Sequence, residues 1–321
     1  MRRRIKAVAT EMDAGRSLID LLAQRYSFRN REQWLETISD RQVMVNGRAG
    51  AISLILKQDD EVLYEAPEAP EPPVNINISL LFEDEDLLVI NKSGNLPCHP
   101  AGAYYENTLW FQVKQKFGLI KPHLINRLDR ETSGVVLVAK NSKVAKKLSD
   151  QFLKHRVEKF YSVVVEGDFP EKSETGGWLM TDGFSAVRKK RRFISGAQNE
   201  KPSEKAEWAE SRFSLIDQIN GLSFLRVELL TGRLHQIRAT LCSLGFPVVG
   251  DKLYGVDDNL FIRFINDRLS ADDKIKLRMD RQALHAECLH LHHPASGEPI
   301  CFTAPLPDDI SAMLSTTLRV A

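Results

Sequence analysis

The sequence predicts an α+β protein with a mixed, largely antiparallel central sheet and flanking helices, preceded by a small N-terminal α/β module. Segments typical of strands and of helices are interspersed without the regular spacing of βαβ units, which argues against a doubly wound parallel sheet. Residues 66–73, with the sequence APEAPEPP, are typical of an extended, semi-rigid spacer. A length of 321 residues fits one large domain and one small one. We therefore expect an N-terminal module at 1–65, a Pro-rich linker at 66–73 and a large domain at 74–321.

The N-terminal module is expected to combine two short helices with a small hairpin-like β piece. Residues 15–22 have the apolar spacing of an amphipathic helix, and a second helical segment lies near residues 33–38. Two strand-like stretches follow, at residues 42–47 and 59–64. The first of them contains Asn46-Gly47, which is a strong turn signal.

The large domain is expected to alternate strands with helices. The run GVVLVAK at residues 134–140 predicts a buried strand, and Asn141 then caps a helix with apolar residues at every fourth position. Two polar stretches, 172–207 and 256–281, look like surface insertions, and the second is helix-prone. The other expected elements are strands at 78–82, 86–92 and 159–167 and a helix at 107–117.

The composition is that of a soluble globular protein, with 43% hydrophobic and 27% charged residues. The net charge is only +1, so any binding to a polyanion must use a local basic face. The four cysteines show no CxxC spacing, which indicates reduced cytoplasmic thiols and neither a disulfide framework nor a zinc site. No apolar stretch follows the basic N-terminus and no run of 18 apolar residues occurs, so we expect neither a signal peptide nor a membrane span.

Residues 123–140, HLINRLDRETSGVVLVAK, contain the first candidate for chemistry. A short strand is expected to end at Leu128, and Asp129 then opens a polar turn that Gly134 closes. An acid on a loop between two strands is well placed to point into a cleft, and the flanking Arg127 and Arg130 favour its ionised form. Taken alone the segment is ambiguous, because a turn aspartate often caps its own backbone.

Residues 231–255 contain the second candidate. A Thr-Gly-Arg turn is expected to lead into a helix that runs to about residue 244 and ends at Gly245. A Pro-Val-Val strand should then precede Gly250-Asp251. The buried side of the helix should carry Ile237, Leu241 and Leu244, and the neighbouring face His235, Arg238 and Cys242. A polar face of this kind is suited to lie over an active site, although an ordinary amphipathic helix explains the pattern equally well.

Together these segments resemble the RluA family of pseudouridine synthases. The family's H-R-L-D-x-x-T-S-G motif is matched at 126–134, and its T-G-R-x-H-Q-I-R motif at 231–238. A K-x-Y strand is matched at 159–161, an opening E-D segment at 83–92 and a closing L-H-A segment at 284–289 followed by His293-Pro294. Five ordered motifs at family spacing, over nearly the whole chain, make a chance match implausible.

The resemblance implies the pseudouridine synthase fold and isomerisation of uridine in structured RNA, without cofactor or metal. It makes Asp129 the nucleophile, Arg238 its ion-pair partner, and Tyr161 both the platform for the flipped base and the candidate base for the C5 proton. The first unit resembles an S4-like RNA-binding domain, so ribosomal RNA is favoured over transfer RNA as partner. We expect a cytoplasmic monomer. The residues expected to contact RNA are Arg127, Arg130, Thr132, Arg233, His235, Arg188, Lys189 and Lys190, the last three in the basic run 188–192.

Two departures from the family pattern lie near the expected cleft. Asn126 stands where the family has histidine, and Ser93 stands where proline is usual. Neither residue is expected to take part in the reaction, so we expect the protein to be active. The two departures are expected to affect which RNA is bound.

The sequence suggests two other interpretations of the function. His285-Ala286-Glu287 matches the H-x-E of zinc nucleobase deaminases, but Cys301 has the wrong spacing and no partner cysteine follows to complete the metal site. The other rival is a non-catalytic RNA-binding protein on a synthase scaffold. The intact Asp129, Tyr161 and Arg238 argue against it.

Overall fold

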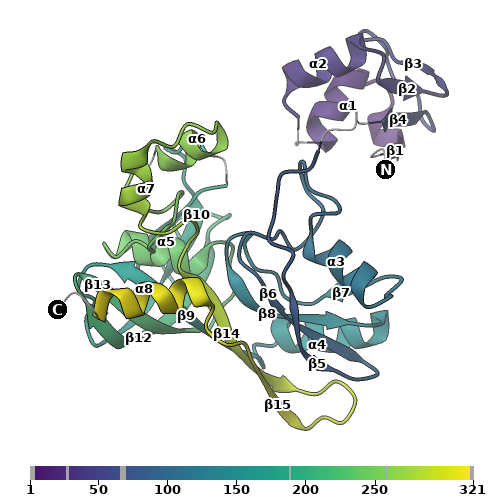
Figure 1. The fold of residues 1–321 in the computed structure, drawn as a ribbon. Helices are drawn as coiled ribbons and strands as arrows, with labels where there is room; N and C mark the ends of the chain where they lie inside the picture. Colours follow the sequence, from purple (N-terminus) through teal and green to yellow (C-terminus); the bar gives the residue numbers. More distant parts are fainter. Residues whose placement is uncertain (1–3, 27–28, 66–69, 188, 258, 319–321) are drawn as a thin grey trace. The chain divides into compact units, whose positions relative to one another are not determined.

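Figure 1 shows the computed structural model of the chain. The chain divides into two compact units, each with its own sheet: Met1–Pro72 with Ala101–Tyr105, and Pro73–Pro100 with Glu106–Ala321. No helix among the described residues is long and apolar enough to cross a membrane. The structure describes residues 4–26, 29–65, 70–187, 189–257 and 259–318.

The first unit has an antiparallel sheet in the order β1-β4-β2-β3 and two helices. The two expected helices and the two expected strand regions are present, and Asn46-Gly47 makes the turn between β2 and β3 with φ of 50° and 76°. The sequence analysis did not anticipate β1, a charged edge strand. The elements are β1 Arg4–Val8, α1 Leu18–Arg25, α2 Arg31–Ser39, β2 Val43–Val45, β3 Arg48–Ala49 and β4 Glu61–Glu65, with a 3-10 turn at Glu11–Asp13.

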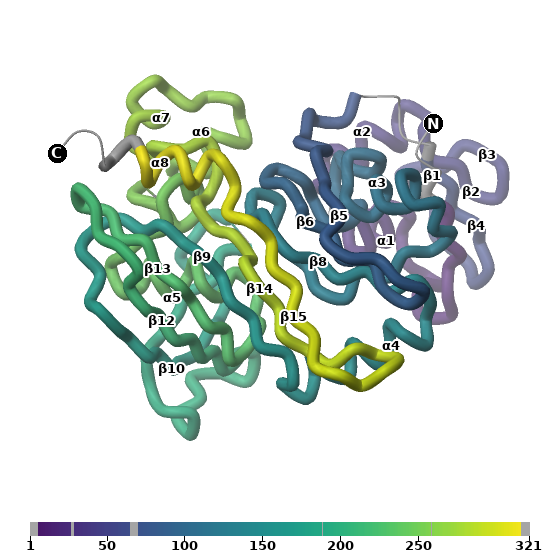
Figure 2. The backbone as a smooth tube through the Cα atoms, turned by 60° about the horizontal axis from the view of Figure 1, so that its bottom comes forward, coloured from purple at the N-terminus to yellow at the C-terminus, as the bar shows by residue number. Residues whose placement is uncertain are grey.

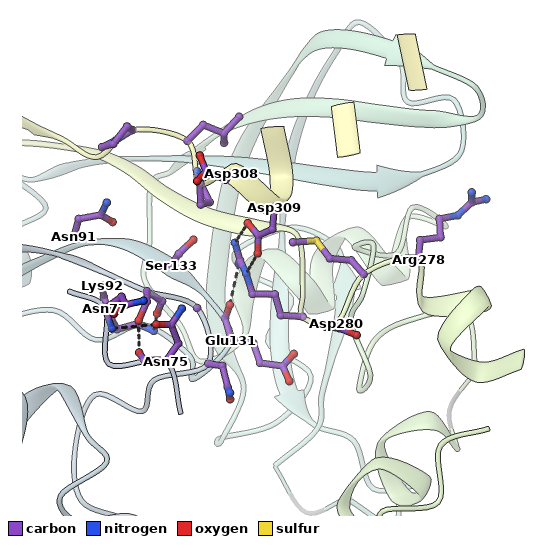
Figure 3. Close-up of a pocket in the computed structure, with 18 of the residues that line it drawn as sticks. Asn75, Asn77, Asn91, Lys92, Glu131, Ser133, Arg278, Asp280, Asp308 and Asp309 are labelled. Carbon is purple, nitrogen blue, oxygen red and sulfur yellow. Dashed lines mark hydrogen bonds and ion pairs between the residues drawn. The ribbon is translucent and has the colours of Figure 1, made fainter. Parts of the chain in front are cut away.

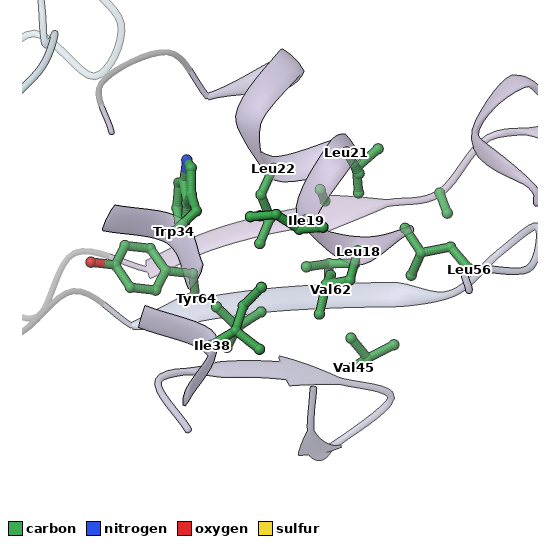
Figure 4. Close-up of a cluster of buried hydrophobic side chains, with 13 residues drawn as sticks. Leu18, Ile19, Leu21, Leu22, Trp34, Ile38, Val45, Leu56, Val62 and Tyr64 are labelled. Atoms are coloured by element: carbon green, nitrogen blue, oxygen red, sulfur yellow. The ribbon is translucent and has the colours of Figure 1, made fainter. Parts of the chain in front are cut away.

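The core of the first unit lies between the two helices and the sheet (Figure 4). Ser17 caps α1 by accepting a hydrogen bond from the backbone N–H of Asp20. The Trp34 side chain of α2 is fully buried and meets Tyr64 of β4 edge-on, with ring centroids 5.1 Å apart. The unit therefore folds around a core of its own.

The second unit contains an 11-stranded sheet, in which β14 pairs with β8 in parallel and the other described pairs are antiparallel. This confirms the predicted mixed, largely antiparallel sheet. Its order is β11-β10-β12-β13-β9-β14-β8-β6-β5, with β15 on β14 and β7 on β8. The strands are β5 Ser79–Glu83, β6 Leu87–Lys92, β7 His123–Leu124, β8 Ser133–Ala139, β9 Glu158–Glu166, β10 Lys172–Thr181, β11 Arg191–Ser195, β12 Glu207–Ile219, β13 Leu222–Leu229, β14 Leu284–His292 and β15 Pro299–Thr303.

Helices cover both faces of this sheet. On β6 and β8 successive residues alternate between α3 Leu109–Lys116 on one face and α4 Ser142–Leu153 on the other. This explains why both strands are continuous apolar runs. At the other end α5 Gln236–Ser243 packs on β9 and β13, while α8 Asp308–Leu318 packs against the opposite face. Figure 2 shows the β14–β15 pair, in yellow, running between β9 and β8.

Three expectations about the large domain were wrong. The strand before Asp129 ends at Leu124 and not at Leu128. Residues 172–207 are not a surface insertion, because they form β10 and β11 at the sheet edge and bury Trp178 and Leu179. The expected Pro-Val-Val strand is a single bridge from Val248 to β9. The expected helical nature of 256–281 was correct: α6 Leu260–Ile265 and α7 Ala271–Leu277 lie there.

Gly134 permits the close approach of β8 to β14. Its φ is +118°, and a Cβ at this position would lie 2.1 Å from the carbonyl oxygen of Ala286. We expect Gly134→Ala to lower the free energy of unfolding by at least about 2 kcal/mol, through backbone strain and overpacking. Gly183→Ala is the matched control, since a Cβ there meets nothing within 4 Å. Denaturant unfolding of both variants tests this, and equal stability of the two would contradict it.

Candidate active site

The loop between β7 and β8 presents Asp129. The Asn126 carboxamide takes over part of the strand ladder here, because it donates to Val135 O at 3.0 Å and accepts from Leu137 N at 2.8 Å. This side chain replaces backbone pairing, which explains why β7 stops early. The N–H of Thr132 then donates to Asp129 O at 3.2 Å and closes the turn. The departure at position 126 thus has a structural role in holding the loop.

Arg238 of α5 joins two carboxylates. Its Nη1 donates to Asp129 Oδ2 at 2.7 Å, while its Nε and Nη2 donate to Asp251 at 2.6 and 2.8 Å. The forked pair with Asp251 fixes the plane of the guanidinium, so the remaining nitrogen is directed at Asp129. The Arg238 guanidinium also lies 4.9 Å from the centre of the Tyr254 ring.

Asp251 was not assigned a role from the sequence. It is 1% exposed, and besides Arg238 it accepts hydrogen bonds from the N–H groups of Leu253 and Tyr254, each at 2.9 Å. A buried carboxylate requires such partners. The apolar residues on both sides of Gly250-Asp251 were a signal that this acid is buried and paired, but they did not identify its partner.

The charges around Asp129 favour its ionised form. Burial alone would raise the pKa of Asp129, but the charge of Arg238, together with its hydrogen bond, outweighs burial and holds this pKa below its ordinary value. The side chain of Asp129 keeps 27% of its surface exposed, whereas that of Arg238 keeps 9%. Arg238 therefore holds the ionised carboxylate of Asp129 in place, while part of this carboxylate remains accessible to a ligand.

His235 stands at the start of α5 in a left-handed conformation, with φ of 58°. Its Nδ1 lies 2.9 Å from the Tyr254 hydroxyl, and its Nε2 lies 3.8 Å from Asp129 Oδ1. Burial lowers the pKa of His235 to about 4, so the ring is neutral near pH 7. A non-glycine residue held at positive φ is typical of functional sites.

Tyr161 of β9 lies at the same site, between Val227 of β13 and Ala286 of β14 in the sheet register. Burial raises the pKa of Tyr161, and the charge of Asp129 raises it further. The phenol is therefore protonated at neutral pH in the free protein. An aromatic ring next to an ionised carboxylate suits the binding of a planar, uncharged base.

A buried network of hydrogen bonds supports the loop that carries Asp129. Lys92 donates to the carbonyls of Ser93, Leu96 and Arg130, and burial lowers its pKa to about 8. Next to it lies a cavity of about 930 Å³, lined by Glu131 and Arg281 among others (Figure 3). Arg281 donates to Glu131 O and forms a forked pair with Asp309. These contacts fix the loop from the side of β14 and α8.

The residues expected to contact RNA differ in accessibility. Arg127 and Arg233 are exposed, and Arg130 lies over the Phe264 ring at 5.3 Å. Thr132 is 3% exposed and its hydroxyl accepts from Gln282 Nε2, so it supports the turn and does not face a ligand.

Within the basic run, the structure separates the neighbouring lysines. Lys189 is exposed, whereas Lys190 is 9% exposed with its ammonium 6.0 Å from the centre of the Tyr254 ring. The expectation that Lys190 forms part of a surface strip was therefore wrong, because the turn before β11 directs it inward. Arg188 lies outside the described residues. Arg192 is exposed.

His285 has a structural role. It is fully buried, with Nδ1 2.9 Å from Ser133 Oγ and Nε2 3.2 Å from Ala304 O. Both ring nitrogens are thus engaged within the fold, which removes the basis for the deaminase interpretation.

The sequence model of the RNA pseudouridylate synthase family matches residues 86–243, which include Asp129, Tyr161 and Arg238. A Chlorobaculum parvum protein named "Uncharacterized RNA pseudouridine synthase" is 32% identical over 307 residues, covering 91% of each chain. The chain belongs to the RNA pseudouridine synthase family. It is an isomerase that acts on RNA.

Two further comparisons agree with this. A Blochmanniella floridana protein named "Ribosomal large subunit pseudouridine synthase D" is 31% identical over 249 residues, covering 76% of this chain and 74% of the relative. The solved structure titled "Human RNA Pseudouridylate Synthase Domain Containing 1" has a TM-score of 0.57 and 21% identity, and covers 78% of this chain and 98% of that one. At this identity the structural likeness shows the fold, and it agrees with the predicted pseudouridine synthase fold.

Proposed function

We propose that this synthase converts uridine to pseudouridine in ribosomal RNA, with Asp129 as the nucleophile. The observation that carries the proposal is the ionised Asp129 carboxylate, held at 2.7 Å by Arg238 and still partly exposed. Asp129 attacks C1′ of the target nucleotide and displaces N1 of the uracil, which leaves as the anion. The uracil turns, and its C5 attacks C1′ and displaces the Asp129 carboxylate. The C5 proton then leaves to a base and N1 gains a proton, so no electron transfer is involved.

Arg238 and Asp251 act as positioning groups for the nucleophile. Arg238 keeps the partly exposed Asp129 ionised, and Asp251 keeps Arg238 from turning away. His235 is neutral and its Nε2 lies 3.8 Å from Asp129 Oδ1, so it does not neutralise the charge of the carboxylate.

Tyr161 is proposed to stack on the flipped base and then to take the C5 proton. The first role suits a neutral phenol, but the second requires a lower pKa than the free protein gives it. Burial is the larger cause of the raised pKa of Tyr161, and the Asp129 charge is the second. Esterification of Asp129 removes that charge, so the pKa of Tyr161 is lower from the attack on C1′ until C5 displaces the carboxylate.

Base flipping leaves a gap in the RNA stack, and we propose that the exposed Arg127 fills it. A planar guanidinium stacks on bases and also neutralises phosphate. Arg130, Arg233 and Lys189 would contact the backbone around the target.

Ribosomal RNA is favoured for two reasons. The relatives named ribosomal large subunit pseudouridine synthase D align with this chain over most of its length. The two helices and the strands that follow them within residues 1–65 also support the proposal of an S4-like module that binds structured RNA. Asp129, Arg238 and Tyr161 come from one chain, which supports a monomer, and we propose that it acts in the cytoplasm.

Carbodiimide mapping of pseudouridine tests the substrate. We expect one or a few reverse-transcription stops in large-subunit ribosomal RNA to disappear in a strain that lacks the protein and to return with the wild-type gene. Loss of stops in transfer RNA alone, with ribosomal RNA unchanged, would overturn the choice of substrate and leave the enzyme class intact.

The exposed cations of the basic run should contribute to RNA affinity. We expect the double variant Lys189→Ala, Arg192→Ala to weaken binding and to reduce the slope of log K against log salt by about 1 to 2. Lys143→Ala with Lys146→Ala, on the exposed side of α4, removes the same charge as a control. Filter binding across a salt series measures both. If the two double variants have the same slope, the basic run does not contact phosphate.

A further inference from the structure

The β14–β15 hairpin brings together three potential metal ligands that are separated in the sequence. One ligand atom each from Cys288, His290 and Cys301 lies within 4.8 Å of the others. The register explains this, because His290 pairs with Cys301 and Cys288 pairs with Thr303. Residues two apart on one strand point to the same face of a sheet, so all three side chains share one face. None of them belongs to the site around Asp129.

We propose that Cys288, His290 and Cys301 bind a thiophilic divalent cation such as Zn²⁺. Two sulfurs and an imidazole nitrogen are ligands that zinc prefers, and water would complete the tetrahedron. The two sulfurs are 3.1 Å apart. Tetrahedral zinc with Zn–S bonds of about 2.3 Å needs about 3.8 Å between them. The thiols must therefore separate by less than 1 Å, which the exposed Cys301 side chain permits.

The surroundings of the three ligands also suit a cation. Glu158 of β9 lies opposite His290, with its Oε2 3.1 Å from His290 Nδ1, and a carboxylate in this position orients a ligating imidazole. The Thr303 hydroxyl lies 3.6 Å from each sulfur and can support the thiolates. A groove of about 360 Å³, lined by Glu158, His290 and Cys301, gives access from solvent. Arg156 also lines this groove and opposes a cation, so the charge of two thiolates is required.

A bound cation would tie β15 to β14, the strand that contacts both β8 and β9. The spacing of the cysteines in the sequence matches no zinc motif. The ligands come together through the pairing of two strands and are not close together in the sequence. The role is structural, and activity does not depend on it.

Cobalt(II) titration of the reduced, metal-free, full-length protein tests this site. We expect one equivalent to bind with a thiolate-to-cobalt charge-transfer band and the visible bands of a tetrahedral centre. Zinc should displace the cobalt and raise the unfolding temperature. Cys301→Ser and His290→Gln should each weaken binding by at least about 100-fold. Cys242→Ser and His123→Gln, which lie away from this groove, serve as matched controls and should bind as the wild type does.

Two results would overturn the proposal. One is wild-type protein that takes up no cobalt with a thiolate band while its four thiols titrate as reduced. The other is uptake that survives in Cys301→Ser and is lost in Cys242→Ser. Circular dichroism shows that each variant is folded. Retained synthase activity of Cys301→Ser and His290→Gln makes a failure here distinct from a failure of the proposed RNA chemistry.

Discussion

Replacing Asp129 by asparagine is expected to abolish pseudouridine formation, with a loss of more than about 10⁴-fold, as when an enzyme loses its nucleophile. The asparagine carbonyl still accepts the hydrogen bond from Arg238, and Asp251 still pairs that guanidinium, so the fold should persist. What disappears is the ionised oxygen that attacks the nucleotide. Single-turnover tritium release from RNA labelled with 5-³H-uridine measures the loss.

RNA affinity provides the control for Asp129→Asn. The variant should bind RNA as the wild type does, because the loop and its cations are unchanged. Full tritium release by this variant would show that another group is the nucleophile. Loss of binding together with activity would show that Asp129 holds the loop instead.

Replacing Arg238 by glutamine should produce the second-largest effect, with activity near pH 7 falling by about 10²- to 10³-fold, the range seen when one aligned hydrogen-bond donor is removed from an active site. The pKa of Asp129 is low because Arg238 outweighs burial. Without the guanidinium, burial and the nearby Asp251 raise it. In wild type Asp129 is already ionised well below neutral pH, so its titration should not limit activity there. In the variant, activity should rise with pH through the raised pKa.

Arg238→Gln also leaves the buried Asp251 and the partly exposed Asp129 without their cation, at a cost of about 3–5 kcal/mol. The double variant with Asp251→Asn removes one of these charges and should recover part of the lost stability. Its activity should stay low. Its acid limb should move only part of the way back, because burial still raises the pKa of Asp129 when the charge of Asp251 is gone. If both variants show the pH profile of wild type, Arg238 does not control the ionisation of Asp129.

The sequence was sufficient to predict the fold class of the large domain and its strands at 78–82, 86–92, 134–140 and 159–167, of which β6 and β8 are continuous apolar runs. The strands from β10 to β15 were not predicted. The sequence also predicted that Asp129, Tyr161 and Arg238 form a site, since each lies in a family motif. The structure brings Arg238 into contact with Asp129 and Tyr161 close to both. Their individual roles remain predictions for the variants above.

The sequence was insufficient where a side chain takes the place of backbone. Asn126 pairs with β8 through its carboxamide, so β7 ends earlier than its apolar residues indicated. The sequence also did not indicate which polar residues on loops are buried. Thr132 and Lys190 have polar side chains on loops, yet both are buried because neighbouring elements cover them.

Partners that depend on long-range pairing could not be found from spacing. Asp251 lies 13 residues after Arg238, and its role appears once the chain folds back beside α5. The same holds for His290 and Cys301, which face each other across a hairpin.

Tritium release by the wild-type protein is the most direct test that this chain forms pseudouridine in ribosomal RNA. The substrate is ribosomal RNA labelled with 5-³H-uridine, extracted from a strain that lacks the protein, and Asp129→Asn is the control. Formation of the C5–C1′ bond expels the C5 hydrogen. Release should therefore reach a plateau of one tritium for each uridine converted, at the positions that carbodiimide mapping identifies. No release from ribosomal RNA, by wild-type protein that binds it, would contradict this account.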